Sequence, residues 1–279
     1  MTERRALLVR TAPALLVILL GAASLLPLDD QLRLESGDAS IVERWSAQLD
    51  GLPAQPDVLV GFDPDLGTYA EVRPTVRVML ADLLNRDARL AFVSLTPEGR
   101  ALALAELERF ERIGANPTRL ADLGYLPGAE AALVSLAREL PPAIEENALA
   151  RRLAGEGLAE VEAILVVGGN DLGPRSWVEQ VAPRIGDVPM LAIAPVILLP
   201  EIRPYIATGQ LHALVATPRD GAAYRESVDL GGFERLAPTG EPSAAAVLVG
   251  LVVALLVLGS ALGGRLARPG TPAAAREPR

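Results

Sequence analysis

The run from Ala244 to Leu262 limits most strongly what this chain can fold into. It reads AAAVLVGLVVALLVLGSAL and contains no charged side chain. As a helix rising 1.5 Å per residue, about 20 such residues cross the ~30 Å hydrocarbon core of a bilayer. A helix of a water-soluble domain is rarely apolar on every face over such a length. The run therefore predicts a transmembrane helix at residues 244–262, and the chain before it is expected to be held at a membrane.

A second apolar run, residues 11–28, follows a short basic N-terminus with Arg4, Arg5 and Arg10. We interpret it as an uncleaved transmembrane anchor because the apolar residues continue to Leu28. The alternative is a signal peptide cut after the small residues 21–23.

The distribution of charge sets the expected topology. Arginines flank the outer end of each apolar run, whereas residues 28–242 carry 33 acidic residues against 19 Arg. The positive-inside rule then places residues 1–10 and the Pro/Ala/Arg-rich tail 263–279, predicted to be disordered, in the cytoplasm. The expected protein is a two-pass cell-membrane protein whose main domain is extracytoplasmic.

The apolar runs and the charge also indicate which partners to expect. The lipid bilayer is the first, and Gly250 and Ala254 have the spacing at which membrane helices pack closely, which would serve a membrane-protein partner or a homodimer. Such small residues are also common in any membrane helix. The net charge of −9 argues against nucleic acid. The absence of Cys excludes disulfides, thiolate zinc sites and cysteine nucleophiles.

The chain between the apolar runs alternates predicted strands and helices. Residues 29–56 are a connector with a helix capped by Asp38, and a Gly/Pro-containing linker occupies residues 231–243. Between them, residues 57–230 predict an α/β domain with a doubly wound, mostly parallel sheet, Rossmann-like or flavodoxin-like, because its apolar strands are nearly continuous. The expected strands are 57–62, 90–95, 120–126, 161–167, 188–194 and 211–217; the expected helices are 68–84, 97–113, 128–140, 174–185 and 196–208.

Candidate ligand-binding residues lie at the ends of three of these strands, and two of the turns that follow are alike. VLVGFDPDLG (58–67) aligns without gaps with ILVVGGNDLG (164–173). This likeness reflects either an old duplication or two turns of the same kind that use the same residue types. Ligands bind outside the carboxyl ends of strands in open α/β sheets. The resulting candidates are Asp63, Asp65, Ser94, Asn170 and Asp171.

Carboxylates at such positions have two interpretations. No cofactor is required by the sequence, but Asp63, Asp65 and Asp171 would suit Mg²⁺ or Ca²⁺ if they converge. Asp and Asn are also the ordinary residues of turns and helix caps. No dinucleotide fingerprint, Walker motif or GxSxG is present, and His212, the single histidine, is expected to be structural.

A resemblance to a known family rests on two further stretches, Asp122-Leu-Gly-Tyr-Leu-Pro-Gly128 and 204–226. With Pro204-Tyr205, Gly209-Gln210-Leu211 and Gly221-Ala-Ala-Tyr-Arg-Glu226, the chain resembles an uncharacterised family of prokaryotic membrane-anchored proteins with an extracytoplasmic α/β domain. Asp122 stands for the family's Asn, Thr208 stands for its Ser, and Arg225 interrupts its acidic ending. The resemblance implies no activity. It adds Tyr205 and Gln210 to the candidate ligand-binding residues, with Tyr125 and Tyr224 beside them.

These observations favour a binding or accessory module, non-enzymatic, that belongs to a membrane complex. The alternative is a membrane-tethered, divalent-metal-dependent hydrolase that uses the carboxylates at the ends of the strands. Convergence of Asp63 with Asp171 would favour the hydrolase, and carboxylates that only cap their own helices would count against it.

Overall fold

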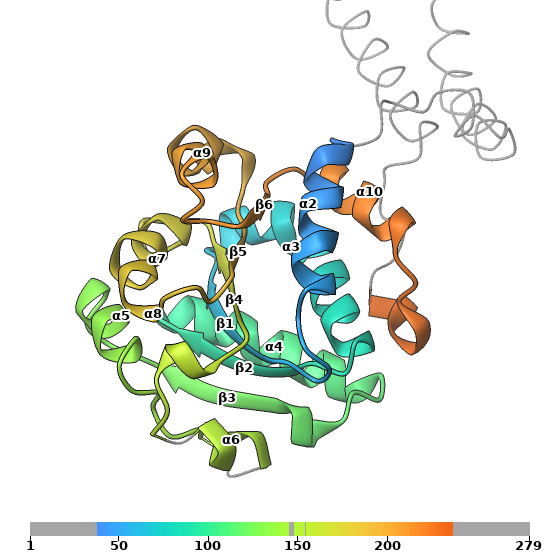
Figure 1. Ribbon diagram of the computed structural model, residues 1–279. Helices are drawn as coiled ribbons and strands as arrows, with labels where there is room; N and C mark the ends of the chain where they lie inside the picture. The colour runs from blue at the N-terminus through green and yellow to red at the C-terminus, as the bar shows by residue number, and fades with distance from the viewer. Residues whose placement is uncertain (1–37, 145–147, 154, 237–279) are drawn as a thin grey trace, which may run out of the picture. The chain divides into compact units, whose positions relative to one another are not determined.

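Six parallel strands form one sheet in the order β3-β2-β1-β4-β5-β6 (Figure 1). The structure, a computed structural model, describes residues 38–144, 148–153 and 155–236. The strands are β1 Asp57–Asp63, β2 Arg89–Ser94, β3 Leu120–Tyr125, β4 Ala163–Gly168, β5 Met190–Ile193 and β6 Ala213–Val215. The predicted parallel α/β sheet is therefore confirmed. Its strand order is that of Rossmann folds and differs from the flavodoxin-like order.

Helices cover both faces of the sheet (Figure 1). One face carries α2 Ala39–Asp50, α3 Leu66–Asn85, α4 Pro97–Arg112 and α10 Pro218–Ser227. The other carries α5 Glu130–Leu136, α7 Pro174–Gln180, α8 Ala182–Ile185 and α9 Leu199–Ala207, with α6 Ala148–Leu153 beside β2 and β3. The described residues also contain short 3₁₀ helices: η1 Pro117–Arg119, η2 Leu158–Glu160, η3 Val196–Leu198 and η4 Gly231–Leu236.

The predicted membrane segments, 11–28 and 244–262, lie outside the described residues, as do 1–10 and 263–279. Within the part of the chain that is described, no helix has both the length and the apolar character needed to cross a bilayer.

Strand β1 lies at the centre of the core, and all seven of its residues are buried. Val58, Val60 and Phe62 pack in the cluster under α3 and α4, whereas Leu59 packs in the cluster under α7. This alternation is the period of two that a strand covered on both faces imposes. Gly61 makes room for Trp177, since a Cβ at this position would lie 2.3 Å from the indole Cζ2.

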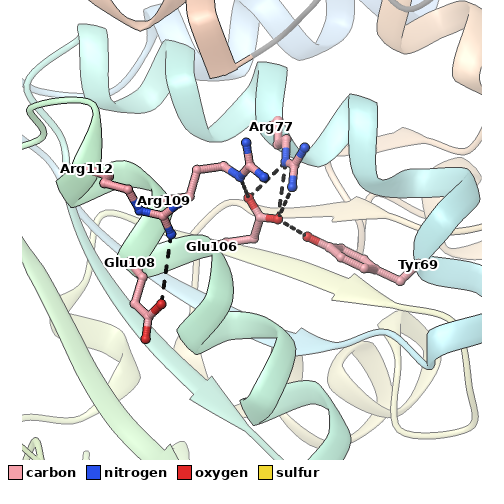
Figure 2. A network of polar contacts seen from close by, with 6 residues as sticks. All are labelled: Tyr69, Arg77, Glu106, Glu108, Arg109 and Arg112. Carbon is pink, nitrogen blue, oxygen red and sulfur yellow. Dashed lines mark hydrogen bonds and ion pairs between the residues drawn. The ribbon is translucent and has the colours of Figure 1, made fainter.

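Helix α3 is tied to α4 by a buried acid, Glu106 (Figure 2). Its carboxylate accepts hydrogen bonds from the Tyr69 hydroxyl at 2.7 Å and from Arg77 Nη2 at 2.6 Å. Arg109 lies 3.9 Å from the second oxygen, and Arg112 forms a separate surface pair with Glu108. Burial and the adjacent Glu106 raise the pKa of Tyr69 above its usual range. Because its charge is matched by Arg77, Glu106 is a structural residue.

The first and last α-helices of the described residues, α2 and α10, pack together. Asp38 caps α2 as predicted, and Trp45 of that helix is fully buried with its ring edge-on to Tyr224, 6.4 Å between centroids. Tyr224 belongs to α10, which the sequence analysis missed, and its hydroxyl donates to Asp82 of α3 at 2.6 Å. The connector helix is therefore an integral part of the domain.

Three local predictions were wrong. Helix α3 begins at Leu66 with Asp65 as its cap, so the expected start at Thr68 was too late. The two prolines in the helix expected at 196–208 predict a break near Pro200 and Pro204, but α9 runs through Pro204 without one. The expected linker begins later than residue 231, because residues 231–236 form η4 with Leu236 buried against the core.

Candidate functional site

The candidate site lies where the direction of strand order reverses, between β1 and β4. Here the connection after β1 enters α3 on one face, and the connection after β4 enters α7 on the other. In this topology ligands bind outside the carboxyl ends of the strands at the reversal. We call this side of the sheet the carboxyl edge and the opposite side the amino edge. Both turns predicted from the sequence do lie at the carboxyl edge.

Asp63, the last residue of β1, is 1% exposed. Its Oδ1 accepts three hydrogen bonds from the turn after β2: Leu95 N at 2.8 Å, Thr96 N at 2.9 Å and Thr96 Oγ1 at 3.0 Å. Its Oδ2 is buried and has no hydrogen-bond partner among the described residues. Burial raises the pKa of Asp63 to about 6, against the opposing effect of the three hydrogen bonds. The side chain thus braces β1 to the β2–α4 turn with one oxygen, and no arginine within residues 38–144, 148–153 and 155–236 pairs with its charge.

Asp65 turns away from Asp63 and caps its own helix. Its Oδ1 accepts Thr68 N at 2.8 Å, a hydrogen bond that lowers the pKa of Asp65. Glu98 of α4 accepts Leu66 N at 2.6 Å. The start of α3, where proteins of this topology hold a pyrophosphate, is therefore occupied by two of the chain's own carboxylates. A phosphate ligand at this position would be repelled.

The turn after β4 is braced against the turn after β1. Asn170 Nδ2 donates to the Asp63 carbonyl at 2.9 Å, and its Oδ1 accepts Leu172 N at 2.9 Å. A Cβ on Gly169 would lie 2.0 Å from Thr68 Oγ1, so only glycine allows the two turns to approach this closely. Both polar groups of Asn170 are used within the scaffold.

The predicted metal site is not formed. Asp63 faces the β2 turn, Asp65 faces its own helix, and the Asp171 side chain is exposed. Within residues 38–144, 148–153 and 155–236, no group of three or more His, Cys, Asp or Glu side chains could hold a metal ion. The physical reason is local: backbone amides at helix starts and turns satisfy Asp63 Oδ1 and Asp65.

The remaining predicted residues are dispersed. Ser94 is buried and donates to the Phe62 carbonyl at 2.8 Å. Tyr205 donates to Glu179 at 2.6 Å on the outer surface of α7 and α9. Gln210, in the turn before β6 at the amino edge, accepts from Thr208 Oγ1 at 2.9 Å. His212 Nδ1 accepts Met190 N at 3.1 Å, which is the structural role expected of it.

Sequence reasoning missed three exposed apolar side chains at the carboxyl edge. Leu66 is 68% exposed, Val196 49% and Ile197 76%. We call these three residues the apolar rim. Two of them are held by carboxylates from other elements, because Glu98 accepts Leu66 N and Glu71 of α3 accepts Val196 N at 3.0 Å. The Glu71 contact also brings the turn after β5 against the N-terminal part of α3 that carries Leu66.

The available sequence signal for the rim was the apolar run Pro195–Leu199, which directly follows a strand without a polar turn residue. The helix expected at residues 196–208 covers this run, and η3 and α9 do form there, but that expectation did not show that Val196 and Ile197 are exposed.

Comparisons with known proteins leave the chain without an assigned family. No family model matches it, and no curated protein matches it in sequence. Among solved structures, a chain titled "Structure of MT0777" is 14% identical, with 66% of this chain and 97% of that chain covered and a TM-score of 0.35. A likeness at this level carries no argument about function.

Proposed function

We propose that this protein is a membrane-anchored, extracytoplasmic binding module that acts as an accessory subunit of a membrane complex and meets its partner through the carboxyl edge of its sheet. The proposed role is binding, without enzymatic activity. Backbone amides engage Asp65 and one oxygen of Asp63, and Asp171 is exposed, so the geometry gives the metal-dependent hydrolase no support.

The apolar rim is the observation that carries the proposal. Large apolar side chains that protrude from a domain mark contact surfaces when they are gathered and held in place. The turns that carry the rim are braced by Glu71, Glu98 and Asn170, so little conformational freedom remains to be lost when a partner binds. Such a surface is ready for contact before the partner arrives.

The membrane anchor rests on the two apolar runs at residues 11–28 and 244–262. The described domain begins at residue 38 and ends at 236, so nine residues separate it from the first run and seven from the second.

Topology is tested by cysteine labelling, for which the cysteine-free chain is well suited. Asp187→Cys introduces a single thiol at an exposed turn. In intact cells this thiol should react with a membrane-impermeant maleimide, and the chain should resist carbonate extraction. Labelling only after lysis would overturn the extracytoplasmic placement, and release by carbonate would overturn the anchor.

The binding role is tested by quantitative co-purification from native membranes. Ile197→Ser should reduce recovery of the partner at least several-fold, because an apolar anchor at the centre of a contact dominates its affinity. Leu104→Ser is the matched control, since Leu104 is an exposed apolar residue on α4, away from the rim. Equal recovery with Ile197→Ser and wild type would remove the rim from the contact.

A further inference from the structure

We propose that the partner segment bound by the apolar rim is a protein segment in which an apolar side chain is flanked by Arg or Lys. This inference rests on the proposed binding role and adds the chemistry of the partner. It is carried by the charges that surround the rim.

Four carboxylates lie on or beside the turns that carry the rim. Asp65 and Glu98 flank Leu66, and Glu71 contacts the backbone of Val196. Asp171 follows β4, which lies between β1 and β5 in the sheet. None of the four forms an ion pair with an arginine of the described residues. Arg175, four positions after Asp171, pairs with Glu201 and Glu179 instead.

The same fold neutralises acids elsewhere. Glu106 meets Arg77, Asp82 meets Arg86, and Asp122 meets Arg100. The carboxyl edge therefore combines apolar side chains with negative charge that the domain itself does not balance. A contact that covers the rim also removes part of the water around these carboxylates, which is unfavourable unless the partner supplies cations. A purely apolar or an acidic partner would leave them uncompensated.

A bilayer surface fits this edge less well. Membrane lipid headgroups are neutral or negative on balance, so they offer the rim no matching net charge. A basic protein segment satisfies both the apolar and the acidic parts of the surface.

The test places a photo-crosslinking amino acid at Ile197 of the full-length chain in native membranes. The control position is Asp187, exposed in the turn before β5 at the amino edge. A triple variant, Glu71→Gln, Glu98→Gln and Asp171→Asn, removes three charges while each glutamine keeps an oxygen to accept the same N–H group. Unchanged unfolding of the triple variant, followed by tryptophan fluorescence, shows that the rim is intact.

The expected result is a protein adduct at position 197, well above the adduct at 187, whose cross-linked peptide contains Arg or Lys beside an apolar residue. The yield should fall about tenfold in the triple variant, since each exposed charge pair contributes a few tenths to 1 kcal/mol. It should also fall in 1 M salt, where the screening length drops to about 3 Å.

Three results would overturn the inference. Adducts to phospholipid alone would make the rim a membrane contact. A protein adduct that is insensitive to the triple variant and to salt would leave the binding role standing without its basic partner. No adduct above the Asp187 control, in a chain shown to be membrane-anchored, would remove both the inference and the proposed use of this edge.

Discussion

Each end of β1 carries a buried carboxylate, but the charge is compensated at one end and not at the other. Asp57 begins the strand and Asp63 ends it, and each is 1% exposed. Asp57 meets two cations, with Arg89 on one carboxylate oxygen and Arg152 on the other, while its backbone N–H donates to Glu162 at 2.6 Å. Among the described residues, Asp63 pairs with no cation, and only one of its oxygens has hydrogen-bond partners.

This difference separates scaffold from candidate site. A buried carboxylate is tolerated when charge and hydrogen bonds are complete, which is the case at the amino edge. At the carboxyl edge the charge of Asp63 is incompletely satisfied, which costs folding free energy. Residues with such perturbed pKa values concentrate at functional positions, although structural networks also produce them.

The largest effect is expected at the amino edge. Asp57→Asn removes the anion shared by Arg89 and Arg152, and should lower the free energy of unfolding by about 3–5 kcal/mol. Urea unfolding followed by fluorescence measures it, because Trp45 and Trp177 are both fully buried. A loss below about 1 kcal/mol would mean that the two arginines find equivalent partners, and the contrast between the strand ends would disappear.

The next effect is the dependence of stability on pH that Asp63 causes. The folded-state pKa of Asp63, about 6, exceeds the unfolded value of 3.8, so its protonation stabilises the fold below pH 4 and this contribution is lost as pH rises through 6. Asp63→Asn removes the titration. The free energy of unfolding of the variant minus that of wild type should therefore increase by about 2 kcal/mol between pH 4 and pH 7. A constant difference, matching that of an Asp187→Asn control, would contradict the assigned burial cost.

A substitution at Thr96 tests the Asp63 end of β1, because the Thr96 hydroxyl forms hydrogen bonds with two groups. It donates to Asp63 Oδ1 and accepts Gly99 N at 3.0 Å as the cap of α4. Thr96→Val should destabilise the fold by about 1–2 kcal/mol and move the Asp63 titration to higher pH, since this hydrogen bond lowers the pKa of Asp63. Thr217→Val, which removes the cap of α10, should give a similar loss of stability without the shift in titration.

The smallest effect is expected for Arg152→Gln. The Arg152 side chain is 50% exposed, and Arg89 continues to neutralise Asp57 in the variant. The free energy of unfolding should fall by less than about 1 kcal/mol in the same urea experiment. A loss as large as that of Asp57→Asn would show that Arg152 carries most of the compensation.

The strands were predictable because their signal is local. Each is a short apolar run after a turn residue, and a sheet covered on both faces requires little else. The start of the helix expected at 97–113 was predictable in the same way, because Thr96-Pro97 is a typical cap and first helical residue, and Thr96 does cap α4. Thr217-Pro218 repeats that signal at the start of α10, but this helix buries few residues, with Tyr224 its one large side chain, so hydrophobic periodicity did not reveal it.

The candidate site was predictable only in position. The sequence places Asp63, Asp65, Asn170 and Asp171 at the carboxyl edge, and they are there. It does not encode which way each carboxylate turns, because that depends on backbone amides of other elements, such as Leu95 and Thr96 for Asp63. The exposure of Ile197 was beyond reach for the same reason: it depends on how the turn after β5 lies on α3.

The packing of α2 against β6 and α10 has a consequence for biogenesis. Trp45 is synthesised early, but it is buried by Tyr224 and by strand β6, nearly 180 residues later in the chain. Contacts of such separation form late and slow the folding of a chain. The tryptophan face of α2 is therefore uncovered until the end of the domain has been synthesised and can pack against it. Chaperone capture at this step is expected to target α2.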